Sequence, residues 1–361
     1  MKAPRWPVVA AFLAGLVCTG CPLPMGDANG QSTDDDVGKQ LEELQSKIAA
    51  LETRLRQKLY GNGAAGERIV TSDIRLKGAD ANRQYTDFIV EPGVTLTVQS
   101  GTVIRCTGTF INRGTIILEH GTIGSDREGG DSSTVLESLR PAAIGVSKLA
   151  AASAEAGDAS SDRAGGRGGE GLSEFESRIL LLPRTQAGGA GGSALASGGG
   201  GGGALTVIAA GEIVNQGQIS ADGEDATAGG GGGGAGILVF ASAVKVTIAA
   251  SSSIAADGGD GGDVTADAAP GGGGGGGIVH LIAPEIDNQG TITVSGGAAG
   301  FTTGGDLISA AVRSGGGGGG ASAGAGGRGG GVPAGDSPAT PAEPGAEGDF
   351  ITTLTDPAAL F

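Results

Sequence analysis

The side chains whose spacing best fits chemistry are aspartates in the second half of the chain. Asp222 and Asp257 each precede a glycine at the same place in two similar segments, 219–223 and 254–258. If these segments stack in register on neighbouring turns of the chain, the two carboxylates come about 4.8 Å apart. Two close carboxylates can act as a glycosidase pair or bind calcium. Asp-Gly is also a common turn dipeptide, and a turn is the interpretation we favour for both positions.

A second group of aspartates follows directly. Segment 258–263 has the sequence Gly-Gly-Asp-Gly-Gly-Asp and resembles one calcium-binding nonapeptide of the repeat-in-toxin type. The resemblance makes Asp257, Asp260 and Asp263 candidates for metal ligands. That site is shared between successive turns, whereas one copy is present here, and Thr265 stands where the repeat has a large apolar residue. We therefore expect no cofactor, with calcium as the alternative.

Little else in the repeat region could support catalysis. Between residues 198 and 320, Lys245 and Arg313 are the only lysine or arginine residues, and Phe240 and Phe301 are the only phenylalanine, tyrosine or tryptophan residues. A polysaccharide lyase needs basic side chains beside bound uronates, and carbohydrate grooves tend to use aromatic platforms. The motifs of serine nucleophiles, phosphate-binding loops and zinc helices do not occur. We predict no catalytic residue.

The N-terminal segment predicts export and lipid attachment. Two basic residues precede the apolar stretch 8–17, which is too short to span a membrane as a helix. The sequence Val-Cys-Thr-Gly-Cys at 17–21 resembles the signal box of bacterial lipoproteins, although Cys18 stands where leucine is usual. The resemblance implies a signal peptide and lipobox at 1–21, a lipid on Cys21 that holds the chain to a membrane, and sorting to the outer membrane. An ordinary secretory signal cut nearby is the alternative.

Residues 37–60 carry the pattern of a coiled coil, and we expect a flexible tether at 22–36 before them. Their apolar side chains alternate in steps of four and three residues, at Val37, Leu41, Leu44, Ile48, Leu51 and Leu55. Lys47 and Glu52 have the spacing of an ion pair between parallel helices. The pattern predicts a homo-oligomer formed through 37–59. A helix that caps the end of the β region is the alternative.

A repeated phrase indicates the fold. Asparagine and glycine, one residue apart and flanked by alternating apolar residues, recur as Asn112 and Gly114, Asn215 and Gly217, and Asn288 and Gly290. The alternation is typical of strands. Because both residue types tolerate the left-handed backbone region, we expect each pair to turn the chain between two strands. Repeats of this kind build stacked arrays rather than one closed globule.

These phrases resemble those of glycine-rich bacterial surface proteins with a right-handed parallel β-helix of the pectin-lyase type, and of filamentous-haemagglutinin-like adhesins. The resemblance implies a mainly β fold, with β-helix coils at 68–124, a low-complexity excursion at 125–197 and glycine-rich repeats at 198–314. We expect the Gly- and Pro-rich tail, 315–361, to be disordered apart from a terminal strand at 350–354. His280 alternates with apolar neighbours, and we expect it to face solvent on a strand.

Four glycine runs punctuate the repeats, at 198–203, 229–234, 271–277 and 315–320. The interpretation we favour is flexible loops at one edge of the solenoid, because ordering glycine costs conformational entropy and buries no apolar side chain. The alternative is a set of polyproline-II-like segments lying side by side, since only glycine allows such close approach. The similar lengths of the runs argue for this alternative.

Composition and charge narrow the function. The net charge of −16 argues against nucleic acid and anionic lipid as partners. The families that the repeats resemble include polysaccharide-cleaving enzymes as well as adhesins. We predict a non-enzymatic, structural or adhesive lipoprotein of the cell envelope or cell surface, with a surface glycan or protein as ligand. A polysaccharide lyase or hydrolase, or a calcium-dependent display module, is the alternative.

Overall fold

The computed structural model describes residues 32–77, 80, 82–120, 166–169, 188–189, 191–192, 198–265, 269–303, 315–316, 318–321, 323–331 and 340–360. The chain divides into two compact units, Met1–Glu52 and Thr53–Phe361. The expected signal peptide with Cys21 lies outside the described residues, as does most of the expected excursion at 125–197. Among the described helices, none is both long enough and apolar enough to cross a membrane.

One long helix, α1 (Ser32–Tyr60), contains the heptad segment. It begins before Val37, inside the stretch expected to be a tether. The sequence there, Ser-Thr-Asp-Asp-Asp, consists of residue types that are common at helix starts. The helix ends where Gly61 adopts a positive φ of 83° and its amide donates to the carbonyl of Gln57.

The rest of the described chain is mainly β, in three six-stranded sheets whose paired strands all run parallel. Sheet A has the order β1 (Arg68–Val70), β4 (Phe88–Val90), β7 (Phe110–Asn112), β10 (Ile213–Asn215), β13 (Lys245–Ile248), β17 (Glu285–Asn288). Sheet B has the order β2 (Ile74–Leu76), β5 (Thr95–Val98), β8 (Thr115–Leu118), β11 (Gln218–Ser220), β14 (Ser253–Ala255), β18 (Thr291–Thr293). Sheet C has the order β3 (Gln84–Tyr85), β6 (Thr102–Cys106), β9 (Ala204–Ala209), β12 (Ile237–Ser242), β16 (Ile278–Ile282), β20 (Asp349–Thr353).

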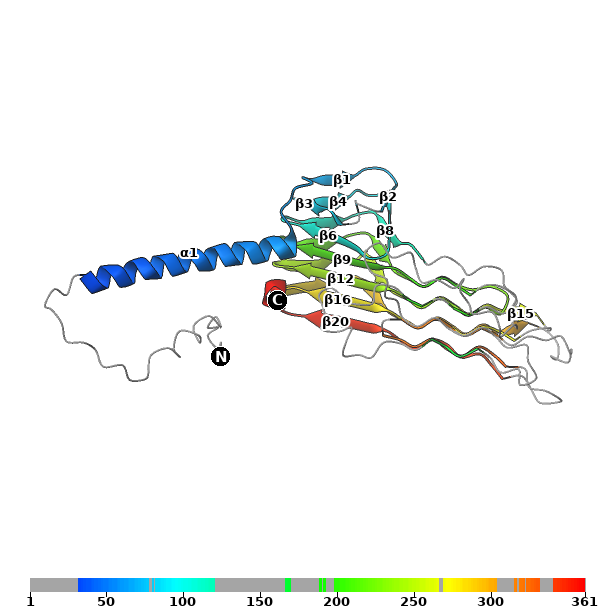
Figure 1. Ribbon diagram of the computed structural model, residues 1–361. Coiled ribbons are helices and arrows are strands. Elements are labelled where there is room, and N and C mark those ends of the chain that lie inside the picture. The colour runs from blue at the N-terminus through cyan, green and yellow to red at the C-terminus, as the bar shows by residue number, and fades with distance from the viewer. Residues whose placement is uncertain are drawn as a thin grey trace, which may run out of the picture. The chain divides into compact units, whose positions relative to one another are not determined.

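Three strands that follow one another in the chain, such as β4, β5 and β6, belong to sheets A, B and C respectively, and we call such a set a trio. Each successive trio therefore adds one strand to each sheet. Strands β6, β9, β12, β16 and β20 lie one below another in Figure 1. A short two-stranded sheet pairs β15 (Val264–Thr265) with β19 (Thr302–Thr303), and a 3₁₀ helix, Pro357–Leu360, follows β20. The order of strands is compatible with a β-solenoid.

The core forms because aliphatic and aromatic residues stack at the same register in successive trios. In sheet B, Leu96, Ile116, Ile219 and Ile254 follow one another in register and are all at most 1% exposed. In sheet A, the rings of Phe88 and Phe110 stack with centroids 5.8 Å apart. Such columns need alternating apolar residues, which explains the alternation in the sequence.

The strands β9, β12 and β16 of sheet C are buried on both faces, which corrects the expectation for His280. The strands β9, β12 and β16 are buried at every residue, and Leu59 and Tyr60 belong to the cluster that includes the outer residues of this sheet. His280 is 3% exposed, and its Nε2 lies 2.8 Å from the Thr353 hydroxyl of β20. Alternation placed His280 on the outer face correctly, but that face is covered.

Two of the predicted asparagines form a buried ladder. Asn112 Nδ2 donates to Asn215 Oδ1 at 2.8 Å, from β7 to β10. Ile248 occupies the next register position and interrupts the ladder, and Asn288 follows on the edge strand β17, where it is exposed. Unsatisfied amides would be costly in this core, so each buried asparagine also binds backbone atoms near its own corner.

The glycines of these pairs are required for a different reason from the expected one. Gly114, Gly217 and Gly290 do not have positive φ. A Cβ added at any of them would lie closer than 3.0 Å to a backbone carbonyl oxygen, of Val94, Gly114 and Ala249 respectively. The corners therefore need glycine because neighbouring trios approach closely, not because the backbone is left-handed.

The glycine runs are ordered segments that hydrogen-bond to one another. Gly199 and Gly202 donate to the carbonyls of Gly231 and Gly234, and the same interval of three residues recurs where Gly232 and Ala235 donate to Gly272 and Gly275. Three residues per turn is the period of polyproline II. Figure 1 shows these segments as wavy continuations of the strands. The favoured interpretation of flexible loops was wrong for the described residues, and the close-packed alternative was right.

The described part of the tail belongs to the same arrangement. Gly318 donates to Gly327, Gly327 donates to Gly273, and Gly324 donates to Gly276. The expected terminal strand is β20, which pairs in parallel with β16. The expectation of disorder in 315–361 failed here because a glycine-rich sequence can order itself through backbone hydrogen bonds, without apolar side chains.

Candidate functional site

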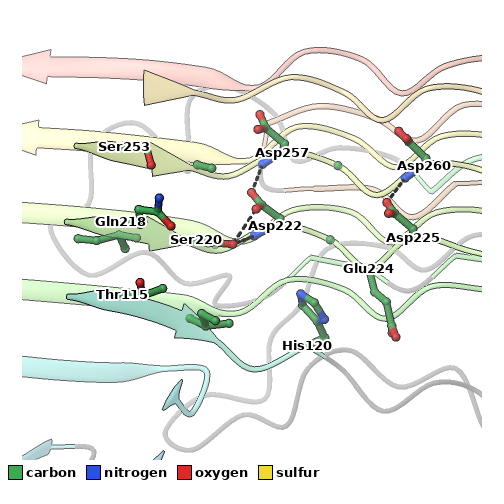
Figure 2. A pocket seen from close by; sticks show the side chains of 15 residues that line it. Thr115, His120, Gln218, Ser220, Asp222, Glu224, Asp225, Ser253, Asp257 and Asp260 are labelled. Carbon is green, nitrogen blue, oxygen red and sulfur yellow. Dashed lines mark hydrogen bonds between the residues drawn. The ribbon is translucent and has the colours of Figure 1, made fainter. Parts of the chain in front are cut away.

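A groove lies where the outer face of sheet B meets the polyproline-II segments that continue from β11 and β14. Its volume is about 760 Å³, within the range of small-ligand sites. Figure 2 shows polar side chains of sheet B at one end of the groove and acidic side chains of the following segments at the other. The lining residues are Thr115, Ile117, His120, Gln218, Ile219, Ser220, Asp222, Gly223, Glu224, Asp225, Ser253, Ala255, Asp257, Gly258 and Asp260.

The sheet contributes a column of uncharged polar groups. Thr115, Gln218 and Ser253 occupy the same register position on β8, β11 and β14. They point outward because the next residue of each strand, an isoleucine, points into the core. Hydroxyl and amide groups at strand spacing can donate and accept hydrogen bonds along an extended ligand.

Asp222 and Asp257 lie on neighbouring trios, as expected from stacking in register, but neither stands in a turn, so the favoured interpretation was wrong. The amide of Asp257 donates to Asp222 Oδ1 at 2.8 Å, and the Ser220 hydroxyl donates to Asp222 Oδ2 at 2.6 Å. Asp257 makes the same link to the next segment, since the Ser295 amide donates to its Oδ1 at 2.6 Å, but its Oδ2 accepts from the Thr293 hydroxyl of that next segment, at 2.6 Å, rather than from its own. Each carboxylate thus links its own segment to the backbone of the next.

The same link recurs one polyproline-II turn further out. The Asp260 amide donates to Asp225 Oδ1 at 2.8 Å, and the Ala298 amide donates to Asp260 Oδ1 at 2.7 Å. The Phe301 amide likewise donates to Asp263 Oδ1 at 2.9 Å. We call Asp222, Asp225, Asp257, Asp260 and Asp263 the carboxylate ladder. Figure 2 shows its first two rows.

The remaining acidic residue of the groove, Glu224, is also committed to the backbone. Its Oε2 accepts a hydrogen bond from the amide of Gly200 at 3.0 Å. All five carboxylates that line the groove therefore accept from backbone amides of neighbouring segments. Their charge still makes the groove acidic, since His120 is the only basic side chain among its lining residues.

The pKa of Asp222 is raised, chiefly because burial penalises the ionised form. The negative charge of Asp257 adds to this effect, while the hydrogen bonds from the Asp257 amide and the Ser220 hydroxyl, and the nearby His120, act in the opposite direction. A raised carboxyl pKa beside a second carboxyl group is a feature of general acids in glycosidases.

The candidate calcium ligands do not converge. Asp257, Asp260 and Asp263 stand on successive turns of one polyproline-II segment, which separates neighbours along the segment by about 9 Å. Each of them accepts from a different amide of the next segment. Within the part of the chain that the structure describes, no group of three or more His, Cys, Asp and Glu residues could hold a metal ion.

The other residues singled out from the sequence lie away from the groove. Lys245 pairs with Glu285 at 2.7 Å and with Asp287 at 3.5 Å, and Phe240 is buried in the core. Arg313 lies outside the described residues. Thr115, Gln218, Ser253 and His120 were not predicted as site residues. The sequence does point to Thr115, Gln218 and Ser253, because each directly precedes a core isoleucine in one of three similar segments.

The groove thus combines an uncharged polar column with an acidic rim whose carboxylates also organise the backbone. The chain matches no protein-family model, no curated protein and no solved structure.

Proposed function

We propose that this chain is an exported cell-envelope protein, lipid-anchored through Cys21, with a structural or adhesive and non-enzymatic role. The observation that carries the non-enzymatic part is the use of the groove's carboxylates. All five accept hydrogen bonds from backbone amides, and moving protons or metal ions onto them would weaken the links between segments. These carboxylates stabilise the stacking of the segments, and the role that remains for the groove is to bind a ligand.

The β unit that carries the groove is, in this proposal, a right-handed parallel β-helix of the pectin-lyase type. Three sheets that each take one strand from every trio support it, as does the Asn112–Asn215 ladder at one corner. The glycine-rich segments are inserted between the sheet B strand and the sheet C strand of a trio, for example between β11 and β12. They widen the solenoid at one side and supply one wall of the groove.

The ligand class follows from the lining. Thr115, Gln218 and Ser253 offer hydrogen bonds without charge, while the acidic rim repels polyanions. We therefore propose that the groove binds a neutral or cationic surface polymer, such as a neutral glycan or a polymer of amino sugars. Acidic polysaccharides are disfavoured by the same charges.

Binding to immobilised polysaccharides tests the ligand class, with dextran as the neutral probe, chitosan as the cationic one and polygalacturonate as the acidic one. Gln218→Ala with Ser253→Ala should weaken binding to dextran or chitosan. Thr97→Ala is the matched control, because Thr97 is a polar residue of β5 in the same sheet but does not line the groove. Equal binding of all three polymers, or no effect of the groove variants, would refute the assignment.

A polysaccharide-active enzyme is the second candidate, because the raised pKa of Asp222 beside Asp257 suits an acid catalyst. Incubation of the protein with the same three polymers, followed by measurement of new reducing ends, separates the two. Cleavage by the wild type that is lost in Asp222→Asn and Asp257→Asn would favour the enzyme. We expect no cleavage of any of the three.

Location is tested on intact cells. We expect added protease to digest the wild-type protein and Cys21→Ala to release it from the membrane fraction. Protection until the outer envelope is opened would place the protein inside and redirect the proposal to envelope scaffolding.

A further inference from the structure

Helix α1 exposes a continuous apolar seam. Val37, Leu41, Leu44, Ile48 and Leu51 are between 41% and 64% exposed, although they follow the four-three spacing that places them on one side of the helix. Leu55, the next residue of the series, is partly buried. An apolar stripe this long on an isolated helix is unfavourable in water, and its narrow width is that of a coiled-coil seam rather than of a helix packed on a globular core.

We propose that a second copy of this chain covers the seam in a parallel, two-stranded coiled coil. In heptad terms, Leu41, Ile48 and Leu55 occupy the a positions, and Val37, Leu44 and Leu51 occupy the d positions. A β-branched residue at a with leucine at the flanking d positions favours two strands, and Ile48 between Leu44 and Leu51 has this arrangement. The helix is 29 residues long, which gives room for the whole seam.

Charge complementarity supports the parallel sense. Lys47 falls at position g and Glu52 at the following e position, and a parallel pair of helices brings the g residue of one beside that e residue of the other. Two such ion pairs would form in a symmetric dimer. An antiparallel pair would bring g beside g and e beside e, which matches residues of like charge or leaves the charges without partners.

The ammonium group of Lys47 can exchange its partner on the same helix, Glu43, for Glu52 of the second helix. Lys47 Nζ lies 2.7 Å from Glu43 Oε1 of its own helix, and the side chains of this pair are each 67% exposed. An exposed pair at i and i+4 contributes little, so it does not hold the ammonium group away from a partner helix. Gln40 and Gln45, at the preceding g and e positions, are uncharged, so they disfavour neither the parallel nor the antiparallel pair.

Helix α1 can form this dimer without the proposed lipid anchor or ligand. If the anchor is present, both N-termini start at one membrane, which is the geometry of a parallel pair. A dimer would also carry two copies of the groove, and two linked binding sites bind a polymer more tightly than one site does.

Sedimentation equilibrium of the full chain in mild detergent gives the mass, and we expect that of two chains. Leu44→Glu with Ile48→Glu should give the mass of one chain, while Glu42→Ala, on the other side of the helix, should not. Lys47→Glu and Glu52→Lys should each weaken the dimer about tenfold by placing like charges together. The double reversal, Lys47→Glu with Glu52→Lys, should restore it, and this test does not rely on a variant that could lose its helix.

Disulfide trapping tests the sense of the pair. Leu44→Cys should cross-link to its own copy rapidly in the parallel arrangement, and Ser46→Cys, on the outer side of the helix, should not. A wild-type mass of one chain or of three, equal cross-linking of the two variants, or a double charge reversal that fails to restore the dimer would each overturn the proposal.

Discussion

Gly297 and Ala298 illustrate at the residue scale why the polyproline-II segments contain so much glycine. A Cβ at Gly297 would lie closer than 3.0 Å to the carbonyl oxygen of Gly259, whereas Ala298, one residue on, is exposed. We predict that Gly297→Ala lowers the free energy of unfolding by about 3 kcal/mol, since the backbone of the neighbouring segment must move. Ala298→Ser is the matched control and should change it by less than about 0.5 kcal/mol. Chemical denaturation of both variants decides the matter, and equal midpoints would contradict the packing described.

His280 gives a residue-scale prediction about pH. Burial lowers its pKa from 6.5 to about 4, so the unfolded chain binds a proton at this site at higher pH than the folded chain does. The stabilising contribution is full above pH 6.5 and is lost as the pH falls through 4. His280→Gln can keep a hydrogen bond to Thr353 and cannot titrate. Between pH 7 and pH 4, the free energy of unfolding of the wild type should fall by about 3 kcal/mol more than that of the variant. If the free energies of unfolding of the two proteins change equally with pH, His280 is accessible to water and the prediction is wrong.

At the scale of elements, the asparagine ladder joins β7 to β10. Asn112→Ala would leave Asn215 Oδ1 and the Gly114 amide without these partners in a buried corner, at a cost of about 1–3 kcal/mol. Asn288→Ala is the control, because the side chain on the edge strand β17 is exposed and should change stability by less than about 0.5 kcal/mol. Thermal melts of the two variants measure the difference. A larger loss from Asn288→Ala would contradict the ladder.

The same elements show how far sequence patterns predict this fold. Alternation around Ile219 and Ile254 predicted strands and their stacking, because a period of two is a property of the strand itself. The burial of His280 could not be predicted, since its cover comes from residues distant in sequence. The glycine runs left two interpretations open because a flexible linker and a close-packed segment have the same composition. The link from Asp222 to Asp257 was predicted as proximity, but not as a bond from carboxylate to backbone amide.

At the scale of the whole molecule, the chain stabilises a glycine-rich structure without covalent cross-links in the region described. Cys106 is the one cysteine there, and it is buried, which raises its pKa to about 12. Stability must come from the stacked aliphatic core and from the many backbone hydrogen bonds between glycine segments. These bonds offset the entropy lost by ordering glycine.

The carboxylate ladder leads to a prediction about metal. Because each ladder residue already accepts from the next segment's backbone and the three calcium candidates are spread along one segment, removal of divalent ions should leave the protein unaffected. We expect the same melting temperature with EDTA and with added calcium. A melting temperature that falls with EDTA and is restored by calcium would contradict this prediction and support a calcium-dependent display module.

The groove requires that the glycine segments are ordered, since they form one of its walls and carry its acidic rim. Amide hydrogen exchange of segments 198–203, 229–236 and 271–277 tests this directly. We predict protection comparable to that of β9 and β12, because the amides of Gly199, Gly202 and Gly232 donate to neighbouring carbonyls. Exchange at the rate of an unstructured chain throughout these segments, while β9 and β12 stay protected, would contradict the account.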